Sequence, residues 1–114
     1  MLSYDDMLED SSLDARAREA ELFGRSIALM READGAGPGS SARFEAGRFT
    51  ERLWTRLMED LASSSNMLPA ALRADLISIG IFMLRELEPA VAGRQRFEPL
   101  AAITEQLRAG LARA

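Results

Sequence analysis

Helix-breaking residues divide the chain into four stretches, and each stretch repeats its apolar residues at helical spacing. Segment 34–41 reads Asp-Gly-Ala-Gly-Pro-Gly-Ser-Ser, and three glycines with a proline in eight residues cannot continue a helix. A polar turn at 63–68 precedes Pro69, which suits a first helical position because its missing N–H has no partner there. No stretch shows the alternating pattern of a β-strand. We therefore expect an all-α, single-domain bundle of about four helices, mostly antiparallel.

These breaks also predict where each helix begins and ends. The first is expected to begin near Ser12 or Asp14, whose short polar side chains can cap a first turn, and to end near Ala33. The third is expected to stop before Pro89, because a proline pushes the preceding residue out of helical conformation. The second, third and fourth helices are predicted at residues 42–62, 69–88 and 99–114.

The negative charge of the chain is concentrated at its N-terminus. The net charge is −4 at pH 7, and the first ten residues contain no Lys or Arg but four acids, Asp5, Asp6, Glu9 and Asp10. The other 14 acidic residues balance the 14 basic ones, so the remainder is formally neutral. We expect residues 1–11 to form a flexible acidic arm and residues 12–114 a bundle domain, with 34–41 as a linker. The formally neutral remainder of the chain argues against non-specific nucleic-acid binding, which needs a surplus of basic residues.

Two missing residue types narrow the possible functions. The chain has no cysteine and no histidine, which removes disulfides and the usual ligands of zinc, copper and haem. It also removes the commonest general base. We therefore expect no enzyme activity, no metal and no cofactor. There is no signal-peptide pattern and no run of roughly 18 apolar residues for a membrane span, so we expect a cytoplasmic protein without membrane contact.

The predicted third helix carries more apolar residues than one core-facing stripe needs. Its primary stripe is Leu72, Leu76, Ile79, Met83 and Leu87, and a second set is Ile77, Ile81 and Leu84. A helix that is apolar nearly all round is either sandwiched in the core or keeps a face for a partner. We predict a partner-binding groove formed by Ile77, Ile81 and Leu84, with contributions from Phe82, Trp54, Leu22 and Phe23. The alternative is that all of them are core. Gly80 in mid-helix indicates a close helix–helix approach.

Three arginines recur at four-residue intervals on the predicted second helix: Arg48, Arg52 and Arg56. Such a row could bind the phosphates of an RNA. The alternative is a solvated, self-neutralised face, because Glu45, Glu59 and Asp60 lie within a turn and Arg56 and Asp60 are four residues apart. The sequence favours the solvated face, so RNA is not the favoured partner.

Three motifs follow one another along residues 52–82. Arg-Leu-Trp-Thr at 52–55 precedes Leu68-Pro69, which is followed by Leu-Ile-Ser-Ile-Gly-Ile-Phe at 76–82. The last helix adds Leu100, Ile103, Leu107 and Leu111. Together the ordered set resembles the FlaF family, over most of residues 48–112. Family members often carry Asn-Arg where this chain has Thr50-Glu51 and Thr104-Glu105, and we expect this difference to affect partner recognition.

The resemblance implies a cytoplasmic protein of the bacterial flagellar system that binds flagellin before export and regulates flagellin synthesis. The partners it implies are flagellin, through a terminal amphipathic helix, and the regulator FlbT. The alternative function is post-transcriptional regulation of flagellin mRNA, acting directly or with FlbT.

Overall fold

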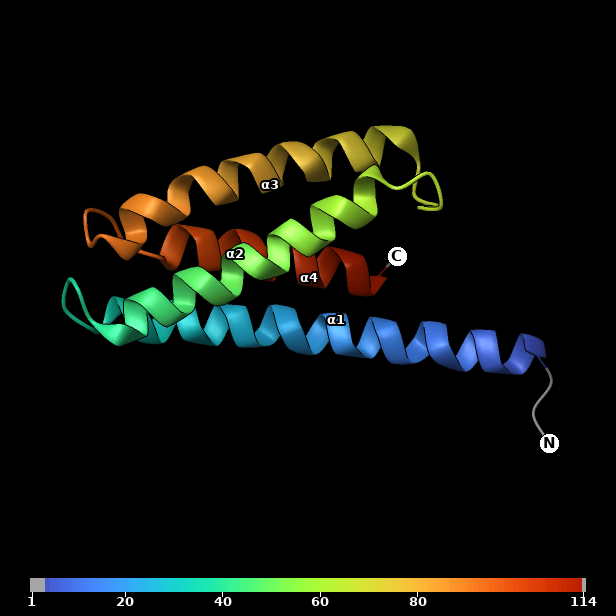
Figure 1. The fold of residues 1–114 in the computed structure, drawn as a ribbon, viewed down its shortest axis with the longest axis horizontal. Coiled ribbons are helices and arrows are strands. Elements are labelled where there is room, and N and C mark those ends of the chain that lie inside the picture. The colour runs from blue at the N-terminus through green and yellow to red at the C-terminus, as the bar shows by residue number, and fades with distance from the viewer. Residues whose placement is uncertain (1–3, 114) are drawn as a thin grey trace.

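The computed structural model describes the backbone of residues 4–113 and the side chains of residues 18–110. This part of the chain folds into α1 (Tyr4–Asp34), α2 (Ser41–Ala62), α3 (Ala70–Val91) and α4 (Glu98–Arg113). Successive helices run in opposite directions, and α4 lies behind α2 in the view of Figure 1. α1 packs against α2 and α4, and α2 packs against α3. The predicted all-α bundle of antiparallel helices is confirmed.

The first helix begins earlier than predicted. α1 starts at Tyr4, so the predicted start near Ser12 or Asp14 is wrong. No glycine or proline occurs before Gly24, so nothing in this stretch breaks a helix, and acidic residues favour a first turn. The side chains of the predicted flexible arm, residues 1–11, lie outside those that the structure describes.

The third helix ends later than predicted. α3 passes through Pro89 and ends at Val91, so the prediction that it stops before Pro89 is wrong. The backbone N–H of Arg94 donates to Pro89 O at 2.9 Å, and that of Gly93 donates to Ala90 O at 3.0 Å. This pair of bonds is a Schellman closure, and Gly93 supplies the left-handed conformation it needs, with φ of 81°. The closure satisfies the last carbonyls, so the helix can extend beyond the proline.

Glycines let α2 and α3 pack closely at two levels. A Cβ on Gly80 of α3 would lie 2.7 Å from Met58 Sδ and 3.1 Å from Trp54 Cε3, which confirms the predicted close approach. A Cβ on Gly47 of α2 would collide with Val91 of α3. Around these contacts the largest fully buried apolar side chains are Trp54, Phe97, Met30, Leu61, Met83 and Leu100.

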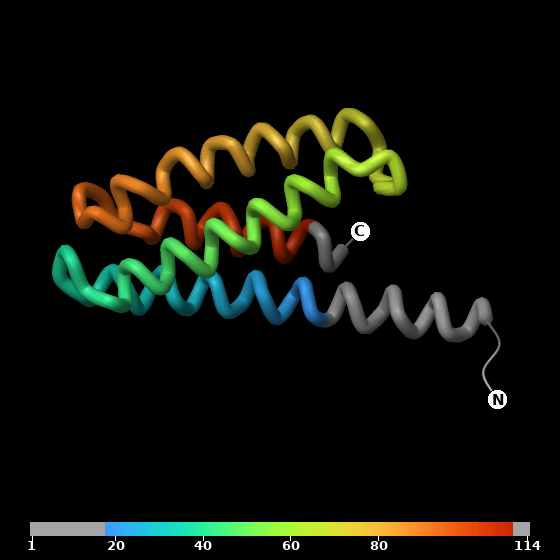
Figure 2. The backbone as a smooth tube through the Cα atoms, in the orientation of Figure 1, coloured from blue at the N-terminus to red at the C-terminus, as the bar shows by residue number. Residues whose placement is uncertain are grey.

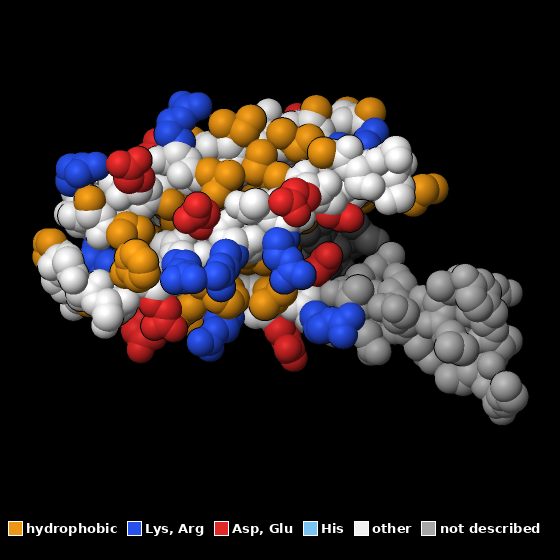
Figure 3. All heavy atoms as spheres, viewed as in Figure 1, with side chains coloured by type: hydrophobic (Ala, Val, Ile, Leu, Met, Phe, Trp, Pro, Cys, Tyr) orange, Lys and Arg blue, Asp and Glu red, His pale blue; other side chains and the backbone are white. Residues whose placement is uncertain are grey.

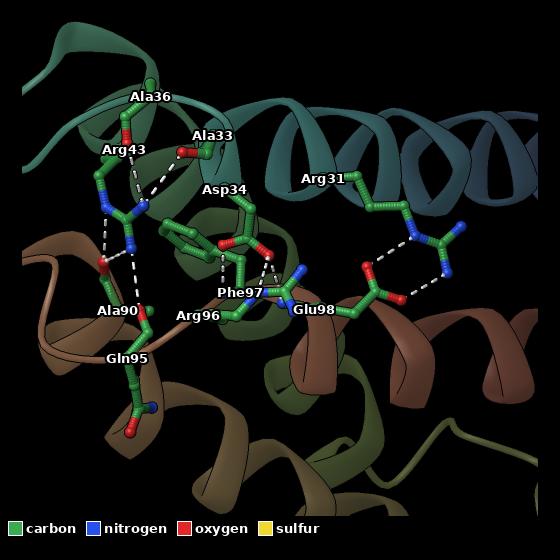
Figure 4. Close-up of polar contacts among 10 residues, drawn as sticks. All are labelled: Arg31, Ala33, Asp34, Ala36, Arg43, Ala90, Gln95, Arg96, Phe97 and Glu98. Carbon is green, nitrogen blue, oxygen red and sulfur yellow. Dashed lines mark hydrogen bonds and ion pairs between the residues drawn. The ribbon is translucent and has the colours of Figure 1, made fainter.

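One end of the bundle brings the α1–α2 and α3–α4 connections side by side (Figure 2). Arg43 of α2 is 6% exposed there and is a donor to both connections (Figure 4). Its Nε and Nη2 donate to Ala90 O at 3.0 and 2.7 Å, and its Nη1 donates to Ala33 O at 3.1 Å. Weaker or more exposed bonds reach Ala36 O and Gln95 O. Because these carbonyls lie at or just past the C-terminal ends of α1 and α3, one cation caps two helices.

Two polar contacts tie α1 to α4 near the same end (Figure 4). The Asp34 carboxylate accepts from the backbone N–H of Phe97 at 2.6 Å and of Glu98 at 2.9 Å, so the last residue of α1 caps the first turn of α4. Arg31 donates to Glu98 at 3.1 and 3.2 Å and to Glu105 at 2.7 Å, and these hydrogen bonds raise the pKa of Arg31.

Candidate partner-binding surfaces

A groove of about 760 Å³ lies between α2 and α3, and we call it the α2/α3 groove. Its apolar wall consists of Phe44 on α2 with Leu84, Leu87 and Val91 on α3. Phe44 is 60% exposed, an unusual position for a large aromatic side chain. The charged and polar lining residues are Arg48, Glu51, Thr55 and Glu88. An apolar channel with polar edges is the kind of surface that accepts an amphipathic helix.

The three residues predicted as the groove share one stripe of α3, because steps of four and three residues return to the same helix face. Of the three, only Leu84 lines the α2/α3 groove, whereas Ile77 and Ile81 lie outside its lining and continue the stripe along α3. Ile81 is 48% exposed, while Ile77 and Leu84 are half-buried. Figure 3 shows apolar side chains gathered over α3 on this face. We refer to Ile77, Ile81 and Leu84 as the α3 stripe.

Two other predicted residues lie away from this stripe. Phe82 is 42% exposed, but one helical residue turns the side chain by about 100°, so it points to a different side of α3 from Ile81. Trp54 has no exposed surface. The prediction that Trp54 contributes to a partner surface is therefore corrected: it belongs to the core, which was the alternative.

A second groove, of about 520 Å³, lies between α1 and α2, and we call it the α1/α2 groove. Leu22 and Phe23 line it from α1. They do not line the α2/α3 groove, so the prediction that they contribute to one groove with Leu84 is wrong. Leu22 is 37% exposed, whereas Phe23 is buried and supplies only the floor. The α2 wall is Phe49, Leu53 and Leu57, and the charged lining residues are Arg18, Glu19, Arg52, Arg56 and Asp60.

The arginine row runs along α2, and Figure 3 shows basic side chains across the middle of the molecule over this helix. The predicted pair of Arg56 with Asp60 is not among the ion pairs of the described residues, and Asp60 accepts from Asn66 Nδ2 at 3.0 Å. Glu45 instead pairs with Arg25 of α1 at 3.9 Å. Among residues 18–110, no ion pair involves the exposed arginines Arg48, Arg52 and Arg56. The solvated face is confirmed, because all three arginines are exposed. The predicted neutralisation by close ion pairs is not found among the described residues, although Glu51 lies in the hollow that these arginines line. We call Arg48, Arg52 and Arg56 the positively charged ridge.

The two threonines that depart from the FlaF pattern are both buried. The Thr50 hydroxyl lies 2.6 Å from that of Ser26 on α1, and Thr104 donates to Leu100 O at 2.8 Å. Neither threonine has exposed surface. The threonine half of the expectation is therefore corrected, since Thr50 and Thr104 lie inside the bundle and act directly on packing. Glu51 and Glu105 are not buried, and Glu51 lines the α2/α3 groove, so an effect of these two positions on partner recognition stays a prediction.

The structure adds no metal site or membrane span to these surfaces. Among the described side chains, no three His, Cys, Asp or Glu residues gather where they could hold a metal ion. No helix in the described part of the chain combines the length and apolar content needed to cross a membrane.

Sequence comparison identifies the family. A search of curated proteins and a search of solved structures each found no significant match. The family model described as "Flagellar protein FlaF" matches residues 1–111, which is nearly the whole chain. The match therefore extends over the first helix as well as the motifs at 52–82. This chain belongs to the FlaF family of flagellar proteins.

Proposed function

We propose that this protein binds flagellin in the cytoplasm before export, as a chaperone that also regulates flagellin synthesis. Membership of the FlaF family makes it a flagellar protein. The observation that carries the proposal is the α3 stripe, in which Ile81 is exposed and Leu84 lines the α2/α3 groove. A terminal amphipathic helix of flagellin would lie along this surface, with its apolar face against Ile81 and Phe44.

The exposed apolar surface accounts for part of such binding. Covering the exposed parts of Ile81 and Phe44 would remove roughly 200 Å² of apolar surface from water, which stabilises a complex by about 5 kcal/mol. Micromolar affinity needs about 8 kcal/mol net, after the costs of association. The groove walls at Leu84 and Val91 must supply the remainder, so the proposal requires the helix to enter the groove rather than touch Ile81 alone.

A pair of neighbouring substitutions tests the surface. Ile81→Asp is expected to weaken flagellin binding at least ~30-fold, because the complex would bury a carboxylate without a partner. Phe82→Asp is the matched control, since Phe82 is similarly exposed but points elsewhere on α3. Both variants should retain the wild-type helical circular dichroism. Equal binding by Ile81→Asp and wild type would exclude the α3 stripe as the flagellin surface.

The positively charged ridge supports a second candidate function, regulation of flagellin mRNA directly or with FlbT. Arg48, Arg52 and Arg56 line a shallow hollow of about 620 Å³ together with Glu51 and Thr55. The three arginines have no ion-pair partner among the described residues. Three phosphate contacts on a single strand give a salt slope of about −2, so affinity should fall roughly 20-fold between 50 and 200 mM salt. Filter binding at these two salt concentrations, with Arg48→Ala beside wild type, measures the slope. An absence of salt-sensitive binding would eliminate this candidate.

A further inference from the structure

We infer that the α1/α2 groove binds the acidic N-terminal segment of a second copy of this chain, forming a two-fold dimer. The groove has an apolar floor of Leu22, Phe23, Phe49, Leu53 and Leu57. Three cationic side chains line the groove beside that floor: Arg18, Arg52 and Arg56. None of them forms an ion pair within residues 18–110. An apolar floor with a surplus of positive charge around it selects a segment that is both apolar and acidic.

The lining also contains two carboxylates, Glu19 and Asp60, which offset two of the three cations in formal charge. Asp60 accepts a hydrogen bond from the neutral side-chain amide of Asn66. Glu19 lies at the α1 side of the groove and has an interaction of its own. The three arginines therefore leave the groove with a surplus of one positive charge, in a protein whose net charge is −4.

The chain itself contains one segment with the complementary chemistry. Residues 1–10 carry four acidic side chains and no Lys or Arg, while the rest of the chain is formally neutral. Tyr4, Met7 and Leu8 stand at i, i+3 and i+4, the spacing that places side chains on one helix face. At helical spacing, Asp5 and Asp10 fall on either side of these three positions, and Asp6 and Glu9 fall opposite them.

The segment cannot reach the groove of its own molecule, because the segment and the α1 side of the groove belong to the same continuous helix. α1 runs unbroken from Tyr4 to Asp34 and contributes Arg18 and Leu22 to the groove. A second copy with its α1 antiparallel to the first can place residues 4–10 beside residues 18–24, with the two-fold axis near residue 14. Under this symmetry each chain donates one segment and receives one, so the contact is closed and self-complementary.

The dimer should depend on charge. Its ion pairs lie near the surface, so they weaken as the screening length falls from about 14 Å near 50 mM salt to about 4 Å near 500 mM. Sedimentation equilibrium of the full chain at these two salt concentrations should show a dimer that dissociates at least ~10-fold more readily at high salt. Arg52→Glu/Arg56→Glu should be monomeric at low salt. Arg48→Glu is the matched control and should still dimerise, because Arg48 is on the same row but does not line this groove.

A charge exchange makes the test specific. The variant Asp5→Arg/Asp6→Arg/Glu9→Arg/Asp10→Arg should also be monomeric, because its segment repels the arginines. Mixed with Arg52→Glu/Arg56→Glu, it should form a heterodimer, since each segment then meets an opposite charge. Three results would overturn the inference: a monomeric wild type at low salt, a dimer that survives Arg52→Glu/Arg56→Glu, or no heterodimer in the mixture. Salt-sensitive RNA binding by a monomeric protein would assign the arginines to RNA instead. Flagellin binding is measured separately with Ile81→Asp, so either idea can fail alone.

Discussion

Replacing Arg43 by methionine should be among the most destabilising single substitutions in this bundle. Methionine keeps much of the length and the apolar contacts of the side chain but removes every hydrogen-bond donor. The guanidinium donates to four carbonyl oxygens, those of Ala33, Ala36, Ala90 and Gln95. It also lies 5.1 Å from the centre of the Phe97 ring. These contacts hold together the end of the bundle where both connections meet.

The size of the effect follows from which acceptors stay buried. Ala33 and Ala90 have no exposed surface. Each of their carbonyls also accepts a backbone N–H at 3.0 Å, from Ala36 and Gly93 respectively, so neither is left without a donor in the variant. The three bonds that the guanidinium makes to these two oxygens are buried and charge-assisted, and each contributes about 1.5–2 kcal/mol. Ala36 and Gln95 are partly exposed and can take water instead. Removing the buried charge returns part of its desolvation penalty. The net loss should be about 3–5 kcal/mol, a large share of the roughly 5–15 kcal/mol typical of a domain.

Urea denaturation followed by circular dichroism measures this loss. With a urea dependence of about 2 kcal/mol per molar, the midpoint of Arg43→Met should fall by roughly 2 M. The urea midpoint of Arg43→Lys should lie between those of wild type and Arg43→Met, because an ammonium cannot reach both helix ends at once. Arg48→Met is the control: an exposed arginine on the same helix, whose loss should change stability by less than ~0.5 kcal/mol. If Arg43→Met and Arg48→Met unfold at the same midpoint, the capping role is refuted.

Four further substitutions at three contacts test how the helices are held together. Asp34→Ala should lower the unfolding free energy by about 1–2 kcal/mol, because the first turn of α4 loses its cap, and hydrogen exchange no faster at Phe97 and Glu98 than in wild type would contradict this. Ser26→Ala and Thr50→Val should each cost about 1–3 kcal/mol, whereas the double variant should cost less than their sum, since neither hydroxyl is then left unpaired. Additive urea midpoints would contradict that pairing. Gly80→Ala should lower the unfolding free energy by about 0–2 kcal/mol, because crowding against Met58 and the Trp54 ring offsets the helix propensity gained; a more stable variant in thermal melts would contradict the close approach.

The helices and the core could be predicted largely from the sequence. Apolar spacing is a local property, so it identified the α2 and α4 boundaries to within a residue or so and the buried stripe of α3. Gly80 also indicated the close packing of α2 against α3. The boundary errors have one cause. Capping and proline preferences describe a helix end in isolation, whereas α3 passes Pro89 because the Gly93 turn and Arg43 complete its last turn.

The candidate surfaces were predictable only in part, because they depend on which helices become neighbours. The spacing of Ile77, Ile81 and Leu84 predicted one stripe, and the structure places Leu84 in the α2/α3 groove. Nothing in the spacing showed that Leu22 and Phe23 face a different groove, since that depends on how α1 and α2 cross. The predicted neutralisation of the arginine row depended in the same way on neighbouring segments, since Asp60 accepts a hydrogen bond from Asn66 in the turn after α2. Arg43 resembles its exposed neighbours in sequence, and only the meeting of two helix ends makes it a core residue.

The most direct test of flagellin binding is a calorimetric titration of this protein with the flagellin of the same organism, full-length and without its C-terminal helix. Binding at micromolar or tighter affinity that disappears with the deletion, and with Ile81→Asp in the full-length titration, is the predicted result. Heat of binding that is unchanged by the deletion, or no binding to either form, would contradict a chaperone that covers the terminal helix of flagellin.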